Sequence, residues 1–354
     1  MIKVNQVKAH LSLDKWRNIG EEGKNSDVWI ARDKQLEQVL ILKKITKKSL
    51  DQQLVEDYFA EAKILNESRH PHIMPVYYSA EDNENVYITM PYYSNGSLNG
   101  LMNKRFLSVR EIIRYSLDFL SGLLFTHIKG LLHLDIKPTN LIINDSDRIL
   151  LTDFGLSKYL NETGSVEQLW QYVAHRSPES YDTVDRTISD DIYQAGLTLY
   201  RMCNGNELFK EQFDHFKSQG QDVLKRAVQK GEFPSRRTYK PHIPLKLIKV
   251  INKMLHPDPD KRYKEVLSII NDLSKIDEML DWYYSEDENI QWVLESENSF
   301  LTVFLENDNG EWLTRAEKYV KSSQRNMKQT KFKGSFKNID KALRFIAESL
   351  KNHK

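Results

Sequence analysis

The sequence predicts an α+β protein with a small β-rich lobe, a large helical lobe and a small C-terminal module. Residues 14–45 alternate apolar and polar positions with turn residues between them, as β-hairpins do. Residues 108 to about 275 show mostly helical spacing, broken by short loops. After about residue 276 an acidic stretch is followed by a basic one. We therefore expect lobes over residues 1–91 and 92–276, and an accessory module over 277–354.

The composition is that of a folded globular protein. Of 354 residues, 40% are hydrophobic and 29% are charged, and the net charge is +1, which neither favours nor excludes nucleic acid. The single cysteine, Cys203, excludes an intrachain disulfide and lies in an apolar run, so we expect it to be buried. The sequence shows no signal peptide and no apolar run of about 18 residues, so we expect no membrane span and a reducing cytoplasmic location.

Further elements of the two lobes follow from the spacing of apolar residues. Residues 51–68 carry apolar residues at positions 54, 55, 58, 59, 62 and 65, which predicts a helix, and "NVYITMPYY" predicts a buried strand. In the second lobe we expect helices over residues 108–128, 189–203, 244–255 and 264–276.

The C-terminal module has an uneven charge distribution. Residues 277–308 contain ten acidic residues and no Lys or Arg, whereas residues 309–354 contain twelve Lys or Arg and four acids. Strand-like runs over 290–296 and 299–306 precede "NDNG", a strong hairpin turn. Residues 328–336 could form a further strand, and apolar residues at 339, 343, 346 and 350 predict a helix. We expect a β-hairpin-plus-helix module.

The segment "HLDIKPTN", residues 133–140, and the "DFG" at 153–155 carry the main chemical signal. In this order they resemble the catalytic loop and the metal-binding motif of the eukaryotic-like Ser/Thr protein kinase family, whose landmarks residues 16 to about 275 match in sequence. The resemblance implies that Asp135 orients the substrate hydroxyl and that Lys137 steadies the γ-phosphate of ATP. Asn140 and Asp153 would hold Mg²⁺, which prefers oxygen ligands.

The nucleotide end of the resemblance begins with "IGEEGKNSDV", which is similar to a glycine-rich phosphate loop. Its candidate ATP-binding residues are Ile19, Gly20, Gly23, Ser26 and Val28. "VLILKKI" resembles the strand whose lysine contacts the α- and β-phosphates. Strand alternation favours Lys43 over Lys44 for this role, because Lys43 shares a face with Ile41. Glu61 on the predicted helix would pair with Lys43.

The stretch "YITMPYYSNGSL" resembles the strand and hinge behind adenine. Met90 would be the gatekeeper, and the Pro91 carbonyl and Tyr93 backbone would bond adenine. Ile142, just after the catalytic loop, is a further candidate for the ATP site.

Three residues are implied to have structural roles. "SPE" at 177–179 resembles the A-P-E element, in which Glu179 would form a buried ion pair with Arg262. "SDDIYQAG" resembles a helix start whose Asp191 would bond the backbone of the catalytic loop.

Leu134 stands where most of the resembling kinases carry Arg before the catalytic Asp. That Arg binds a phosphate on the activation loop, and Leu cannot make a charged pair. We therefore expect an active kinase of the non-RD type, which lacks this Arg and is not gated by that phosphate. Ser157, Thr163 and Ser165 remain candidate autophosphorylation sites, although a solvated polar loop explains these hydroxyls equally well.

Tyr172 is a second departure. Where the resembling kinases have a Thr that contacts the catalytic Asp and Lys, "QYVAHRSPE" places Tyr172, whose hydroxyl lies much farther from its backbone. We expect a remodelled substrate platform.

The basic tail could bind nucleic acid or a partner protein. Lys328, Lys331 and Lys333 would lie on the possible strand with Phe332 between them. Basic strand faces are usually only solvated, and the preceding acidic run could neutralise this one within a single fold.

Two other functions stay open at this point. A pseudokinase scaffold would suit the irregular glycine-rich loop and Tyr172, but the complete set of Lys43, Glu61, Asp135, Asn140 and Asp153 argues against it. A small-molecule kinase of related fold would tend to lack Lys137, the A-P-E element and the Asp191 helix. The substrate is expected to be a protein carrying Ser or Thr, and the compact landmarks look more bacterial than eukaryotic.

Overall fold

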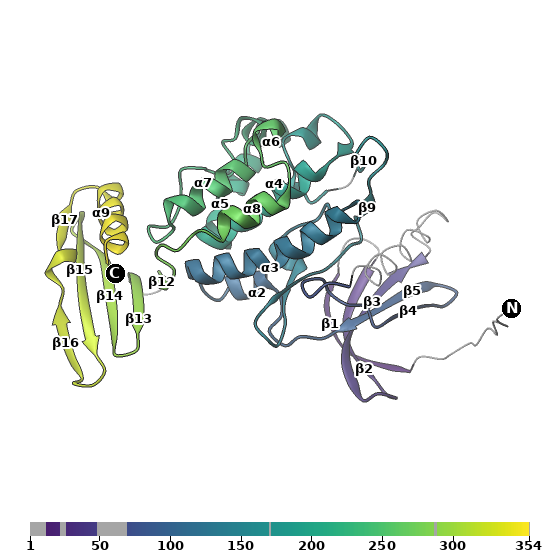
Figure 1. The fold of residues 1–354 in the computed structure, drawn as a ribbon, viewed down its shortest axis with the longest axis horizontal. Coiled ribbons are helices and arrows are strands. Elements are labelled where there is room, and N and C mark those ends of the chain that lie inside the picture. Colours follow the sequence, from purple (N-terminus) through teal and green to yellow (C-terminus); the bar gives the residue numbers. More distant parts are fainter. Residues whose placement is uncertain (1–11, 22–25, 48–68, 170, 287–288, 354) are drawn as a thin grey trace. The chain divides into compact units, whose positions relative to one another are not determined.

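The computed structural model describes residues 12–21, 26–47, 69–169, 171–286 and 289–353 (Figure 1). The predicted helix over residues 51–68, with Glu61, lies outside these ranges, as does Gly23. The chain divides into two compact units, Met1–Ser94 and Asn95–Lys354.

The first unit contains a five-stranded antiparallel sheet in the order β1-β2-β3-β5-β4. The strands are β1 (Leu13–Glu21), β2 (Ser26–Asp33), β3 (Gln38–Thr46), β4 (Tyr78–Glu81) and β5 (Asn85–Pro91). The hairpins predicted over residues 14–45 and the buried strand "NVYITMP" are therefore confirmed. Alternation along β3 separates two apolar clusters: Ile45 packs with Val86 and Ile88, whereas Leu40 and Leu42 pack with Ala31.

Helices dominate the first part of the second unit. The predicted helices are confirmed as α3 (Val109–Ile128), α4 (Ile188–Asn204), α7 (Leu245–Met254) and α8 (Val266–Leu273). Two of these helices have a capping box at the N-terminus. Ser108 and Glu111 form the capping box of α3, and Thr187 and Asp190 form that of α4. The sequence analysis did not predict α2 (Leu98–Met102), α5 (Asn206–Lys217) or α6 (Gln221–Lys230). None of the helices in the described ranges is long and apolar enough to cross a membrane.

Short strands and 3₁₀ turns shape the polypeptide between α3 and α4. The strands are β6 (Leu131–Leu132), β7 (Leu141–Ile143), β8 (Ile149–Leu151), β9 (Lys158–Tyr159), β10 (Val166–Glu167) and β11 (Asp185–Arg186). The 3₁₀ turns are η2 (Pro138–Asn140), η3 (Val173–His175) and η4 (Glu179–Tyr181), and η5 (Pro259–Lys261) lies between α7 and α8. The antiparallel pairs β6–β9, β7–β8 and β10–β11 hold this region in shape.

A six-stranded antiparallel sheet and one helix form the end of the chain (Figure 1). The strands are β12 (Trp282–Ser285), β13 (Ile290–Ser296), β14 (Ser299–Asp308), β15 (Glu311–Val320), β16 (Arg325–Lys328) and β17 (Gly334–Phe336). The helix α9 (Ile339–Lys351) buries Ala342, Ile346 and Leu350 in one core with Trp292 and Val303 of the sheet. The predicted turn is confirmed, since only Asn309 and Gly310, both at positive φ, join β14 to β15. The predicted hairpin is thus part of a larger sheet, and the predicted helix packs against that sheet.

The prediction of a strand over residues 328–336 is wrong for residues 330–332. Thr330–Phe332 is the 3₁₀ helix η6, and Lys328 and Lys333 lie on either side of it. Phe332 is fully buried in the core beneath α9 and is not displayed between the lysines. Lys331, Phe332 and Lys333 alternate exposed, buried and exposed, which is the pattern of a strand, although the backbone forms a 3₁₀ turn here.

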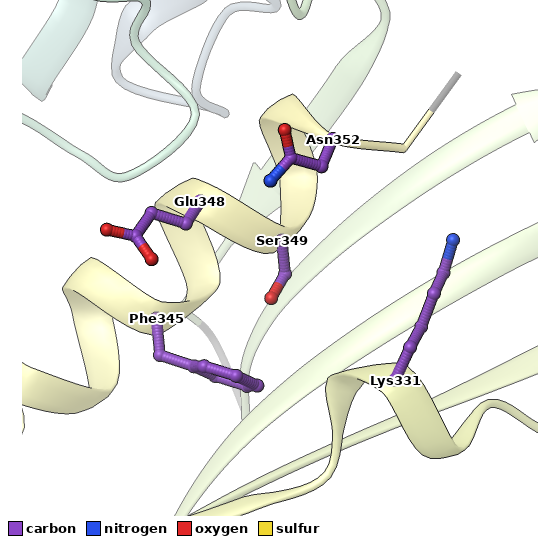
Figure 2. Close-up of a pocket in the computed structure, with 5 residues that line it drawn as sticks. All are labelled: Lys331, Phe345, Glu348, Ser349 and Asn352. Atoms are coloured by element: carbon purple, nitrogen blue, oxygen red, sulfur yellow. The ribbon is translucent and has the colours of Figure 1, made fainter.

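A small hollow lies between η6 and α9 (Figure 2). Phe345 and Ser349 border it from α9, and Lys331 borders it from η6. Its volume of about 280 Å³ is below the usual size of a small-molecule site.

Ion pairs and ring contacts join the start of this sheet to the helical part of the unit. Arg110 of α3 forms a bidentate pair with Asp281 (2.6 and 2.8 Å), and Lys240 pairs with Glu286 at 2.7 Å. His242 stacks on the Tyr284 ring with centroids 5.5 Å apart.

Candidate active site

Lys43 lies in the interior of the first sheet, at the centre of β3. It is 5% exposed and stands opposite Val28 of β2 and Ile88 of β5. Met90 stands opposite Ile41, two residues from Lys43 and therefore on the same face of the sheet. Lys44 points to the other face, so the structure places only Lys43 beside Val28 and Met90.

The other nucleotide-site candidates of this unit lie at strand ends. Ile19 and Gly20 are near the end of β1, where Gly20 stands opposite Val28, and Ser26 begins β2. Pro91 closes β5 opposite Leu40. Tyr93 follows two residues later, partly buried.

Asp135, Lys137 and Asn140 form one hydrogen-bonded cluster on the loop after β6. The Lys137 ammonium donates to Asp135 Oδ2 at 2.7 Å. The Asn140 amide nitrogen donates to the same oxygen at 2.9 Å and to the Asp135 backbone carbonyl at 2.9 Å. Asp135 is 6% exposed. A nearly buried carboxylate therefore holds a cation and an amide in fixed positions at the base of the loop.

The first turns of α4 hold the backbone of this loop. The buried carboxylate of Asp191 accepts from the N–H groups of His133 (2.9 Å) and Leu134 (2.7 Å). Gln194, one turn later, accepts from the Ile136 N–H at 2.9 Å and donates to the Leu134 carbonyl at 3.0 Å. Leu134 needs this support because its φ of +65° is unfavourable for a side chain of this size. The sequence analysis had not singled out Gln194.

His133 connects the loop to the "DFG" segment. Its Nε2 lies 3.1 Å from the Thr152 carbonyl, and its Nδ1 accepts from the Asp135 N–H at 3.3 Å. The ring also meets Phe154 edge to face, with centroids 4.7 Å apart. Burial lowers the pKa of His133, so the imidazole is held neutral with its proton on Nε2.

Asn140 and Asp153 are the candidate metal ligands, and the local geometry suits that role. The Thr152 N–H donates to the Asn140 carbonyl at 3.0 Å, and Asp153 follows with a φ of +63°. Because the Asn140 amide nitrogen is committed to Asp135, the orientation of its amide oxygen is fixed. Two protein oxygens fit Mg²⁺ completed by phosphate and water. Within the described ranges no group of three or more His, Cys, Asp or Glu side chains could hold a metal.

A second buried histidine links the loop to the polypeptide that follows the activation segment. His175 Nδ1 lies 2.9 Å from the carbonyl of Ile136, the residue between Asp135 and Lys137. Arg201 Nη1 lies 3.1 Å from His175 Nε2. Burial, with the Arg201 charge, lowers the pKa of His175 well below its usual value. The neutral ring therefore donates to Ile136 and accepts from Arg201, a connection that nothing in the linear sequence indicates.

Glu179 and Arg262 form a bidentate ion pair with two N–O distances of 2.7 Å. The Arg262 side chain is fully buried and also donates to the carbonyls of His256 (2.7 Å), Pro257 (3.1 Å) and Ser189 (3.0 Å). Every nitrogen of the guanidinium is thus bonded, as a buried charge requires.

Leu134 belongs to a buried apolar cluster. It is fully buried with Leu132 and Val166, and Leu156, Leu160 and Ile188 pack against them. Leu156, Leu160 and Val166 belong to the segment after "DFG", so this cluster holds that segment against the catalytic loop by apolar contact.

The candidate phosphorylation sites differ in accessibility. Ser157 is partly buried and its hydroxyl donates to the His133 carbonyl at 3.2 Å. Thr163 is exposed and donates to the Asn161 side chain at 2.7 Å, and Ser165 is partly buried beside it. Cys203 is buried, as expected, and burial raises the pKa of its thiol.

Comparison with known proteins gives one consistent family. The protein kinase domain family matches residues 13–274. The serine/threonine-protein kinase PknD of Protochlamydia amoebophila is 25% identical over 303 residues, which cover 75% of this chain and 30% of that protein. The probable serine/threonine-protein kinase pknA2 of Bifidobacterium longum is 32% identical over 200 residues, 54% of this chain and 26% of that protein.

A plant relative is matched over more of its length. The serine/threonine-protein kinase Aurora-1 of Arabidopsis thaliana is 30% identical over 244 residues, 68% of this chain and 79% of that protein. The chain spans only about a third or less of the two bacterial relatives. Since relatives come from bacteria and from plants, a bacterial origin stays a prediction.

Proposed function

The chain belongs to the protein kinase family, and on that premise we propose that it is an ATP- and Mg²⁺-dependent serine/threonine protein kinase. The observation that carries the proposal is the cluster of Asp135, Lys137 and Asn140, joined by bonds of 2.7 and 2.9 Å. Phosphoryl transfer needs mainly positioning and charge neutralisation, and this cluster supplies a base, a cation and a metal ligand on one loop.

The reaction assigns a role to each residue of the loop. The Ser or Thr hydroxyl oxygen forms a bond to the γ-phosphorus of ATP while the bond to the bridging oxygen breaks, and ADP leaves. Asp135 orients the hydroxyl and takes up its proton. Lys137 places its ammonium beside the γ-phosphoryl oxygens, where negative charge must be stabilised. The hydrogen bond between Lys137 and Asp135 holds both groups ready before the substrate arrives.

We assign the remaining nucleotide contacts residue by residue. Lys43 is the proposed ligand of the α- and β-phosphates, and its place on the Met90 face of β3 supports it over Lys44. The Pro91 carbonyl and the Tyr93 backbone are the proposed adenine contacts. Asn140 and Asp153 are the proposed Mg²⁺ ligands, and the bound ion would neutralise phosphate charge. The division into lobes at residues 1–91 and 92–276, with a module at 277–354, is part of the same proposal.

The test is a phosphorylation assay with purified protein, Mg²⁺, γ-labelled ATP and a generic Ser/Thr protein substrate. The wild type is expected to produce phosphoserine or phosphothreonine, read by mass spectrometry. Asp135→Asn and Lys43→Ala are expected to lose the activity. Lys44→Ala is the matched control, because it removes the adjacent lysine from the opposite face of the same strand.

The result also decides between the candidate functions. ATP binding without transfer would favour a pseudokinase scaffold. Transfer to a small molecule but never to protein would favour a small-molecule kinase. If the protein modifies itself, we expect the phosphate mainly on Thr163, since its hydroxyl is more exposed than those of Ser157 and Ser165. A cytoplasmic location stays a prediction from the sequence.

We further propose that the C-terminal module binds an acidic segment of a partner protein through its basic surface. We use this name for the exposed basic residues between β16 and α9, which are Arg325, Lys328, Lys331, Lys333, Lys337, Lys341 and Arg344. Only one acidic residue, Asp340, lies within residues 325–344.

Four acidic residues at the start of the module have partners outside it. Asp281 pairs with Arg110, Glu286 pairs with Lys240, and Asp277 and Glu278 pair with Lys246 at 3.3 and 3.0 Å. These three cations come from the helical part of the unit. These four acids are therefore paired with the helical part. Two others pair within the module, Glu295 with Lys321 at 2.9 Å and Glu306 with Arg315 at 2.7 Å. None of these six acids pairs with a residue of the basic surface defined above.

An acidic peptide fits this surface better than a single-stranded nucleic acid does. The Phe332 ring, which could have stacked on a base, is buried in the core. The probe is a labelled twelve-residue polyglutamate peptide, followed by fluorescence anisotropy at low and at high salt. Lys333→Glu with Lys337→Glu is expected to abolish binding, whereas Lys210→Glu with Lys264→Glu, an equal charge change elsewhere, is expected to preserve it. Tighter binding of a 20-nucleotide single-stranded DNA would overturn the choice of partner.

A further inference from the structure

The ring of Tyr172 lies over the ammonium of Lys137. The Lys137 Nζ is 5.1 Å from the ring centroid, within the range of a cation–π contact. The same ammonium also donates a hydrogen bond to Asp135 Oδ2 at 2.7 Å. Lys137 is thus held between a carboxylate and an aromatic face.

The backbone around Tyr172 fixes the ring in this place. Tyr172 precedes η3, and its carbonyl accepts from the His175 N–H at 2.9 Å. The His175 ring lies 5.7 Å from the Tyr172 ring and is itself bonded to the Ile136 carbonyl at 2.9 Å. Since Ile136 directly precedes Lys137, one buried histidine sets the distance between the Tyr172 turn and the catalytic lysine.

From this geometry we infer that Tyr172 is a positioning residue for Lys137 and that it acts through its ring rather than its hydroxyl. The inference rests on the proposed phosphotransfer function. An aromatic face orients an ammonium without neutralising it, so Lys137 keeps its full charge for the γ-phosphoryl group. The Asp135 bond alone would leave the lysine free to pivot about that oxygen, and the ring removes this freedom.

The hydroxyl offers a different explanation. Burial lowers the pKa of Arg201 to about 10, and an electrostatic interaction with Tyr172 partly opposes this fall. A role of the hydroxyl through Arg201 is therefore the competing explanation. Phenylalanine keeps the ring and removes the hydroxyl, so it separates the two explanations.

The experiment compares kcat and KM for ATP and for a protein substrate in four variants of the full chain. Tyr172→Phe is expected to keep wild-type kcat. Tyr172→Leu and Tyr172→Gln are expected to lower kcat about two- to fivefold, the effect of losing one exposed cation–π contact, with KM for ATP unchanged. Glutamine covers the case in which leucine impairs folding, since Tyr172 is 49% exposed. Tyr283→Leu, which makes the same change at a tyrosine 46% exposed in β12, is expected to have no effect.

Each outcome has a defined meaning. Full kcat in Tyr172→Leu, or equal losses in Tyr172→Phe and Tyr172→Leu, would overturn the role of the ring. A loss confined to KM for the protein substrate would also overturn it, because the residue would then only bind the acceptor. Failure of the wild type to transfer phosphate would instead refute the proposed function, so the two failures are distinguishable.

Discussion

Replacing Leu134 by alanine tests whether apolar contact orders the segment after "DFG". Leu134 is fully buried and packs with Leu132 and Val166, so its truncation removes buried methyl groups and leaves a cavity. Leu→Ala changes in cores cost about 2–5 kcal/mol of unfolding free energy. The positive φ does not alter this figure, because alanine and leucine are similarly strained there.

This energy is comparable to that of the contact between an Arg and an activation-loop phosphate, which the family usually has in place of Leu134. A hydrogen bond to a charged group contributes about 1.5–3 kcal/mol. The apolar cluster can therefore hold the segment without any phosphate, and we expect the unphosphorylated protein to have an ordered segment and full activity.

Urea unfolding and native-state hydrogen exchange measure the effect on phosphatase-treated protein. In the wild type the Leu160 N–H donates to the Gly130 carbonyl at 2.7 Å, and β9 pairs with β6. In Leu134→Ala these amides are expected to exchange faster, together with the loss of 2–5 kcal/mol. Leu134→Met, which conserves volume, is the control and is expected to cost less than about 1.5 kcal/mol. Unchanged exchange of the Leu160 amide in Leu134→Ala would refute the reasoning.

Three further predictions concern buried polar groups. Burial lowers the pKa of His242 to about 3 from 6.5, so the unfolded chain binds an extra proton below pH 6.5 and stability falls with falling pH. Between pH 7.5 and 5.0 the free energy of unfolding is expected to fall by about 2 kcal/mol for this reason. Urea unfolding at both pH values should show that His242→Phe does not have this loss. His215→Phe, at an exposed histidine, should still have it. Arg262→Met breaks a buried bidentate pair and is expected to lose about 3–5 kcal/mol in urea unfolding, whereas Lys264→Met, at an exposed pair, is expected to lose under about 1 kcal/mol. Gln194→Leu leaves two backbone groups of the catalytic loop without partners, which costs about 1–3 kcal/mol of stability for each group. This variant is expected to lower kcat as well as stability. A wild-type kcat would contradict the proposal that Gln194 supports the catalytic loop.

Local patterns predicted much of the fold. The helices α3 and α7 have clear apolar spacing, and the alternation along β2 and β3 reflects a sheet that buries both faces. In contrast, α5 buries only Phe209 completely, so charged and aromatic residues mask its periodicity. All four residues of β16 are exposed, and a strand of this kind carries no alternation to detect.

The order of motifs indicated the candidate residues, but tertiary contacts determine how they are held. The sequence placed Asp135, Lys137 and Asn140 on one short segment, where their mutual contacts are local. Gln194 and His175 reach the same loop from 58 and 39 residues away. Contacts over such separations depend on how α4 and η3 pack, which a single sequence does not reveal.

The strand order of the C-terminal module determines how quickly this part of the chain can fold. From β12 to β16 each strand pairs with its neighbour in the sequence, and only two residues join β14 to β15. Sheets built from successive hairpins have low contact order, and a hairpin forms in about 1–10 μs. The module leaves the ribosome after the helical part of its unit, so its central hairpin can form at once and recruit α9 when that helix follows. We therefore expect the pairing of these strands to be among the fast steps in the folding of the chain.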